Sequence, residues 1–161
     1  MMNKHICFLV KSLIFIGGMI AFLASFALRN PWLQYLGLPG WLMINIFVHE
    51  IGHLFGCVIN HNQVVRMSFY WFDYSQGKLQ PNNRIPYSSY CTFKKKGHDA
   101  LVYIMGPTFS LCLFLISLFM RVNLQFPIMY VVLSALFVLV NCCPNKNSDL
   151  MMLISCLGKR S

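Results

Sequence analysis

The stretch Val48-His49-Glu50-Ile51-Gly52-His53-Leu54 lies inside an otherwise apolar run from Trp41 to Ile59. On a helix, positions i and i+4 share one face, so His49 and His53 can bind one metal ion. Glu50 sits about 100° further round the helix, where it can reach a water molecule on that metal without binding the metal itself. An ionisable group inside a membrane span costs roughly 2.5–3.5 kcal/mol on insertion scales, so Glu50 indicates a functional site.

The composition is that of an integral membrane protein. Hydrophobic residues make up 57% of the 161-residue chain and charged residues 11%, with a mean hydropathy of +0.59. Soluble proteins are usually about 45–50% apolar. Four apolar segments meet or approach the roughly 20 residues that a helix needs to cross a bilayer: Cys7–Leu28, Leu38–Ile59, Ala100–Met120 and Phe126–Cys143. We therefore expect an all-α polytopic fold with about four transmembrane helices.

The distribution of the basic residues predicts the orientation of the chain in the membrane. A net charge of +9 does not indicate nucleic-acid binding here, because the basic residues lie between the apolar segments rather than along one face. With the N-terminus inside, all 13 Lys and Arg except Arg29 and Arg121 fall on the cytoplasmic side, which is a clear positive-inside bias. Lys11 is expected to snorkel out of the first span, and Lys94-Lys95-Lys96 to face anionic headgroups. We predict a multi-pass protein of the cell membrane with both termini cytoplasmic and the histidine pair in the cytoplasmic half of its span.

The first apolar segment has a second interpretation. Lys4 precedes it, and Ser25-Phe26-Ala27 loosely resembles a signal-peptide cleavage site. Its apolar run exceeds the usual 7–15-residue core of such signals, which favours a retained span. We expect one membrane-embedded domain over residues 1–161, in which residues 1–37 form an extra N-terminal span and loop.

The connection Asn60–Gly97 is the only sizeable polar one. Val64–Tyr74 and Arg84–Phe93 are rich in aromatic and β-branched residues, as strands are. Two turn signals lie between them, Ser75-Gln76-Gly77 and Pro81-Asn82-Asn83. We predict a short β-hairpin insertion, at or partly within the cytoplasmic membrane surface. The alternative is an interfacial loop anchored by Trp71 and Tyr74.

The seven cysteines form no metal-binding or redox spacing. Buried apolar thiols explain most of them, and disulfides are not expected on the cytoplasmic side. Cys57 lies four residues beyond His53 on the same face, so it is either an alternative metal ligand or a core thiol. The core thiol is the simpler interpretation.

The histidine pair needs a third ligand, because a catalytic zinc site typically has three protein ligands and one open position. Apart from Glu50, the acidic residues are Asp73, Asp99 and Asp149. Asp99 opens the third span, where a helix N-cap explains it, and Asp73 lies in a predicted strand. Asp149 follows a break at Pro144, and a broken helix at membrane depth must pack on protein or line a wet cavity. Spacing alone explains Asp149 equally well as a ligand or as an acid in the first turn of a short helix.

Three motifs together resemble the site-2 protease family of intramembrane zinc metalloproteases. His49-Glu50-Ile51-Gly52-His53 is similar to the family's His-Glu-x-x-His on a membrane helix, and Met105-Gly106-Pro107 to its Gly-Pro element on the next core helix. Asn141, Pro144 and Asp149 match the offsets of its Asn-x-x-Pro…Asp-Gly motif. The resemblance covers about Trp41–Leu157. It assigns residues 38–157 to a metalloprotease core without PDZ or other accessory domains.

The resemblance implies a mechanism. One zinc ion per chain is held by His49, His53 and Asp149 with one position open, and Glu50 is the general base that passes a proton from water to the departing amine. Asn141 is a hydrogen-bonding group near the substrate or oxyanion, or else it satisfies the broken helix. The implied substrate is a single-span membrane protein or hydrophobic peptide, cleaved in or near its transmembrane segment. Leu150 departs from the family pattern, which has glycine there.

Two other classes of function stay open. The chain could be a catalytically inactive membrane subunit or immunity-type protein that retains a metal site. It could also carry a metal or haem, since five histidines are present, but His5, His61 and His98 form no paired arrangement across helices. If it is a protease, we expect a strand edge within Val64–Tyr74 to hold the unwound substrate by strand addition.

Overall fold

The computed structural model describes residues 4–28, 30–68, 72–75, 77–81, 90–94, 99–124, 126–143 and 148–158. Several residues that the sequence singles out lie outside these described residues: Arg29, Trp71, Gln76, Asn82, Asn83, Lys95, Lys96, His98 and Pro144.

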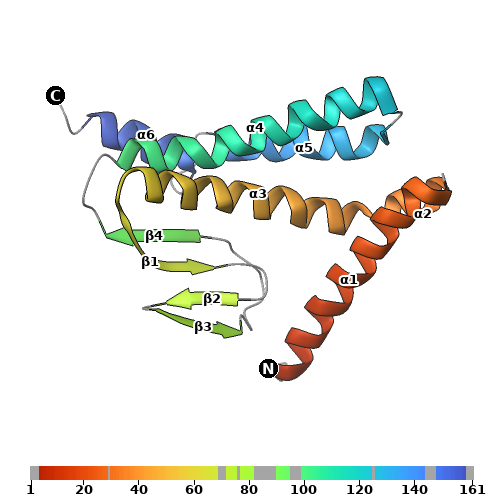
Figure 1. Ribbon diagram of the computed structural model, residues 1–161, viewed down its shortest axis with the longest axis horizontal. Coiled ribbons are helices and arrows are strands. Elements are labelled where there is room, and N and C mark those ends of the chain that lie inside the picture. The colour runs from red at the N-terminus through yellow and green to blue at the C-terminus, as the bar shows by residue number, and fades with distance from the viewer. Residues whose placement is uncertain are drawn as a thin grey trace.

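The described residues form a mostly helical fold with one small sheet (Figure 1). The helices are α1 (Lys4–Leu28), α2 (Pro31–Leu36), α3 (Leu38–Ile59), α4 (Asp99–Leu124), α5 (Ile128–Cys142) and α6 (Asp149–Gly158). Three of them contain segments long and apolar enough to cross a membrane, Phe8–Leu28, Leu38–Ile59 and Ala100–Val122. The predicted helical class and the broken helix near the C-terminal end are confirmed.

The fourth apolar segment is shorter than the other three. Helix α5 has 15 residues and so spans about 22 Å at 1.5 Å per residue, against a hydrocarbon layer of about 30 Å. Helix α5 begins directly after Pro127, because proline lacks the N–H that a helix interior needs. The chain then re-enters a helix at Asp149, the first residue of the 10-residue α6. The C-terminal apolar sequence is thus divided into two short helices.

Helix α3 is central, with α1 on one side and α4 and α5 on the other (Figure 1). The α1 and α3 backbones meet at Gly18 and Gly40, since a Cβ on Gly18 would lie 2.7 Å from the Gly40 nitrogen. Beyond this contact the rings of Phe22 and Trp41 stack with centroids 5.2 Å apart. The buried hydrophobic cluster around these two rings also includes Phe126, Tyr130 and Val131. Helix α1 therefore contributes to the same core as the helices of residues 38–157.

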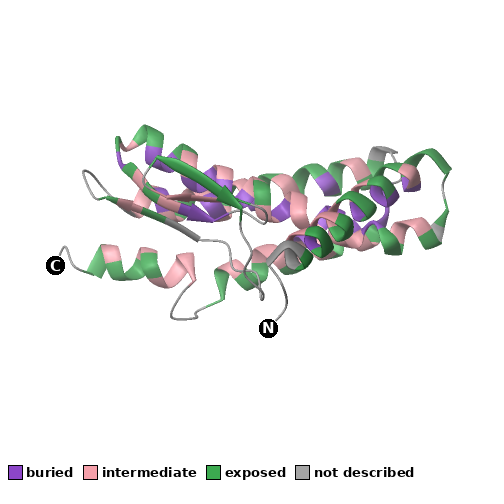
Figure 2. Cartoon of the chain, turned by 90° about the horizontal axis from the view of Figure 1, so that it is seen from below, coloured by how far each residue is buried: buried purple, intermediate pink, exposed green. Residues whose placement is uncertain are grey.

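The outside of the helices is apolar, as a bilayer requires. Buried residues gather where helices face one another (Figure 2), whereas large apolar side chains such as Leu13, Phe47 and Phe119 are exposed. Lys11 is only 4% exposed. The expectation that it snorkels is therefore wrong, because neighbouring protein covers the side chain.

A four-stranded antiparallel sheet connects α3 to α4 and confirms the predicted β insertion. Its strands are β1 (Gln63–Ser68), β2 (Phe72–Ser75), β3 (Lys78–Pro81) and β4 (Tyr90–Lys94), in the order β3-β2-β1-β4. Gly77, between β2 and β3, has φ 80°, which glycine adopts without a steric penalty. The expectation of a free edge within Val64–Tyr74 is wrong, because β4 pairs with the open side of β1 and leaves β3 and β4 as the edges.

The register gives the sheet one apolar and one polar face. Directly paired residues lie on the same face: Tyr74 pairs with both Met67 and Leu79, whereas Asp73 pairs with Gln80. Met67 is 2% exposed but Leu79 is 64% exposed. The apolar face is thus covered at Met67 of β1 and open at Leu79 of the β2–β3 hairpin.

Candidate metal centre

Two buried histidines on α3 form the base of the centre. His49 and His53 lie one turn apart, as their i and i+4 spacing predicts, and both are buried. Their Nε2 atoms are 3.1 Å apart, with the two rings almost perpendicular at 88°. The helix therefore points the same ring atom of each histidine at a common point.

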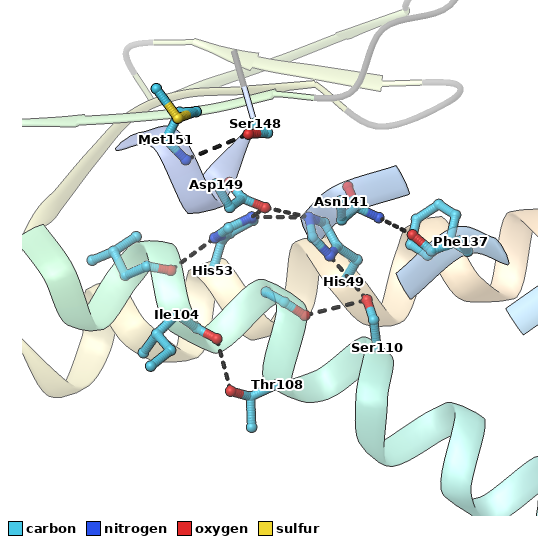
Figure 3. Close-up of polar contacts among 12 residues, drawn as sticks. His49, His53, Ile104, Thr108, Ser110, Phe137, Asn141, Ser148, Asp149 and Met151 are labelled. Atoms are coloured by element: carbon cyan, nitrogen blue, oxygen red, sulfur yellow. Dashed lines mark hydrogen bonds and ion pairs between the residues drawn. The ribbon is translucent and has the colours of Figure 1, made fainter. Parts of the chain in front are cut away.

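Asp149 reaches this point from a distant part of the chain (Figure 3). Its Oδ2 lies 3.0 Å from His49 Nε2 and 3.4 Å from His53 Nε2. Helix α6 packs against α4, and α4 packs against α3, so the first residue of α6 is brought back to the histidines. Asp149 is the first residue of a short helix, as one interpretation has it, and its carboxylate faces the histidine pair, as the ligand interpretation requires. The described residues that could hold a metal ion are His49, His53 and Asp149.

The Asp149 side chain is a carboxylate at neutral pH. Burial raises the pKa of its carboxyl group, but hydrogen bonds and charge from His49 and His53 outweigh the burial and lower the pKa to about 2. A protonated carboxyl would present a donor as well as an acceptor. The low pKa instead leaves Oδ2 as an acceptor directed at the two imidazoles.

The other ring nitrogen of each histidine contacts α4. His53 Nδ1 lies 2.8 Å from the Val102 carbonyl oxygen, and His49 Nδ1 lies 2.9 Å from Ser110 Oγ. A carbonyl oxygen can only accept, so the proton of a neutral His53 is on Nδ1. In this neutral form His53 Nε2 carries a lone pair, as metal binding requires, whereas in the protonated imidazolium form the Nε2–H donates to Asp149.

Glycines bring α3 and α4 close enough for these contacts. A Cβ on Gly52 would overlap the Met105 carbonyl oxygen, and a Cβ on Gly56 would lie 2.8 Å from Val102 Cα. A Cβ on Gly106 would overlap the His53 ring itself. Gly52 and Gly56 thus permit the close packing of α3 on α4, and Gly106 of the Met105-Gly106-Pro107 motif makes room for the His53 ring.

Glu50 and Asn141 lie next to this group in different ways. Glu50 is buried on α3 directly after His49. On α5, the Phe137 ring contacts the His49 ring edge-on, with centroids 5.7 Å apart. Asn141, one turn further along, donates from Nδ2 to the Phe137 carbonyl oxygen at 2.8 Å and is drawn beside His49 in Figure 3. This contact corresponds to the alternative in which Asn141 satisfies its own helix.

The remaining candidates are not in the group. Cys57 is fully buried but is not among the residues that could hold the metal, which leaves the core thiol interpretation. Asp73 accepts a hydrogen bond from Ser68 Oγ at 2.6 Å within the sheet. Asp99 is the first residue of α4, and its side chain is not among those described.

Sequence reasoning missed Val102 and Ser110, which contact the histidines from α4. A backbone carbonyl carries no sequence signal. A serine in an apolar helix is ordinary, because its hydroxyl can bond to its own helix. Comparisons of the chain with protein-family models, with curated proteins and with solved structures found no match.

Proposed function

We propose that this protein is an intramembrane zinc metalloprotease, similar to the site-2 protease family, that hydrolyses peptide bonds in or near the transmembrane segment of a membrane protein or hydrophobic peptide. The observation that carries the proposal is the contact of Asp149 with His49 and His53 on an apolar helix of membrane-spanning length. Two imidazoles and one carboxylate, with a fourth position left for water, are the ligands of catalytic rather than structural zinc sites.

The spacing of the three ligand atoms supports zinc. A tetrahedral zinc with bonds of about 2.0–2.2 Å needs its ligand atoms about 3.3–3.6 Å apart. The three separations are 3.0, 3.1 and 3.4 Å, so only small shifts of the side chains are needed to admit the ion. When both imidazoles carry their proton on Nδ1, all three facing atoms are acceptors, and a positive charge between them satisfies all three. Metal binding supplies that charge and requires the neutral imidazoles.

Zinc and Glu50 would carry out different parts of the hydrolysis. Zinc bound at this site would lower the pKa of a water molecule to about 7 and polarise the scissile carbonyl. The Glu50 carboxylate takes the proton of the attacking water and delivers it to the departing amine nitrogen as the C–N bond breaks. The Asn141 amide has a second N–H besides the one given to Phe137, and this N–H can donate to a substrate oxygen.

A comparison of metal content and cleavage tests the proposal. Wild type, Glu50→Gln and His49→Ala are purified in detergent, assayed for zinc by mass spectrometry, and reconstituted with a panel of single-span reporter proteins. We expect about one zinc per wild-type chain. The Glu50→Gln variant should keep its zinc and lose at least 100-fold in cleavage rate, and His49→Ala should lose both.

The same experiment separates the other classes. Unchanged cleavage by Glu50→Gln would contradict the mechanism. Full zinc occupancy without cleavage of any reporter by wild type would favour the inactive membrane subunit. Haem absorbance in the purified wild type would favour the carrier.

A further inference from the structure

One face of α4 contacts the two histidines of α3. Val102, Gly106 and Ser110 are spaced four residues apart, so they lie on one stripe of the helix. The Val102 carbonyl oxygen contacts His53 Nδ1, Ser110 Oγ contacts His49 Nδ1, and Gly106 leaves the space that the His53 ring occupies. The stripe thus meets the side of each imidazole that faces away from Asp149 (Figure 3).

The hydroxyl of Ser110 has a defined direction. Ser110 Oγ donates its single hydrogen to the Gly106 carbonyl oxygen at 3.3 Å. With that hydrogen used, the oxygen can accept from His49 Nδ1, which lies 2.9 Å away. In this Nδ1–H form, which is the one that binds a metal ion, His49 Nε2 carries a lone pair directed at the point that it shares with His53 Nε2 and Asp149 Oδ2.

We propose that Ser110 is a positioning residue that accepts the Nδ1–H of His49 when Nε2 binds metal, and thereby raises the affinity of the centre for zinc. The inference rests on the proposed function only in taking His49 as a zinc ligand. It adds to the site a residue that touches neither the metal nor the substrate.

The two histidines differ in how their protons are held. His53 donates to a backbone carbonyl, which no substitution at Val102 removes. His49 donates to a side chain, and Ser110 is 0% exposed, so bulk water does not reach the position to replace a deleted hydroxyl. Without that acceptor, the Nδ1–H of a metal-bound His49 is buried without a hydrogen-bond partner, which disfavours the metal-bound form. Loss of such a partner of a metal-bound histidine typically weakens metal affinity 10–100-fold.

Serine-to-alanine variants at two positions of α4 make a matched test. Ser117 is also 0% exposed and also bonds its own helix, donating to the Phe114 carbonyl oxygen at 2.7 Å. It lies about two turns beyond Ser110 and serves as the control. Zinc affinity of the full chain in detergent is measured by competition with a chelator, without substrate. We expect Ser110→Ala to bind zinc 10–100-fold more weakly and Ser117→Ala to bind as wild type does.

Two further measurements separate positioning from packing. Ser110→Cys keeps a side chain of similar size with a weaker acceptor, so its affinity should fall between those of wild type and Ser110→Ala. In zinc-loaded protein, NMR of labelled histidines should show the His49 Nδ1–H proton with the downfield shift of a hydrogen bond in wild type, and that proton should move upfield in Ser110→Ala. A His49→Gln sample assigns the signal.

Each outcome decides the inference. Wild-type zinc affinity in Ser110→Ala, an equal loss of affinity in Ser117→Ala, or an unchanged His49 Nδ1–H shift in Ser110→Ala would overturn it. Absence of zinc binding by wild type would overturn it together with the proposed function. Zinc binding without proteolysis, combined with weakened binding in Ser110→Ala, would overturn only the protease assignment.

Discussion

The ring of His53 packs against Gly106 of α4 in a space that any side chain would fill. The contact explains why a glycine stands in the middle of a long helix, where it is normally less favourable than alanine by about 1 kcal/mol. It also joins two of the motifs found in the sequence, because the glycine of one motif accommodates the histidine of the other.

Gly106→Ala should weaken metal binding without unfolding the protein. The added methyl group displaces the His53 imidazole from the position that it shares with His49, while alanine favours the helix itself. We expect at least a roughly tenfold loss of zinc affinity, measured by chelator competition. Gly17→Ala is the control, since nothing lies within 4 Å of a Cβ at that position. Full zinc affinity in Gly106→Ala would show that the ring is not held as described.

Asp149→Asn should abolish metal binding, because an amide keeps the shape of the side chain but lacks the charge that balances the cation. The loss of zinc affinity should exceed the 10–100-fold loss that is typical when a residue hydrogen-bonded to a metal ligand is removed. Asp73→Asn is the matched control, since Asp73 lies on the sheet beside Ser68. Zinc content of both proteins is measured by mass spectrometry. Equal zinc content in the two variants would exclude Asp149 as a ligand.

Gly18→Ala should destabilise the protein, whereas Gly17→Ala should not. A Cβ on Gly18 would press on the Gly40 backbone, while a Cβ on Gly17 meets nothing within 4 Å. Forcing extra volume into packed contacts costs about 1–3 kcal/mol, and glycine-to-alanine exchange in an open helix position gains up to about 1 kcal/mol. Unfolding midpoints of both variants in detergent should therefore move in opposite directions. A common shift would contradict the docking of α1 on α3.

The open half of the apolar sheet face should contact lipid if the insertion lies at the membrane surface. Leu79 and Gln80 are adjacent on β3 but belong to opposite faces. We expect a tryptophan placed by Leu79→Trp to be quenched by brominated lipids, and one placed by Gln80→Trp to be quenched by aqueous iodide. Both quenching measurements are taken as differences from the fluorescence emission of the wild-type protein in liposomes. Equal iodide quenching of the two would place the hairpin in water.

The sequence by itself determined the features that depend on local geometry. Hydropathy and length marked the three long apolar helices, and the 3.6-residue turn placed His49 and His53 on one face. The β-branched and aromatic content of residues 64–74, with the turn at Gly77, predicted strands between α3 and α4. Each of these follows from residues within about two turns or one hairpin of one another, so no knowledge of packing was needed.

Only the tertiary structure decided which distant residues complete the centre. Sequence spacing allowed two interpretations of Asp149 and gave no indication of Ser110. The sequence also predicted a free sheet edge within Val64–Tyr74, where β4 in fact pairs with β1. These features depend on how closely α3, α4 and α6 approach one another, and that distance is set by glycines whose neighbours lie on another helix. The stretch from His49 to His53 therefore places two imidazoles on one face by helix geometry alone, whereas the approach of Asp149 and Ser110 to these imidazoles depends on helix packing.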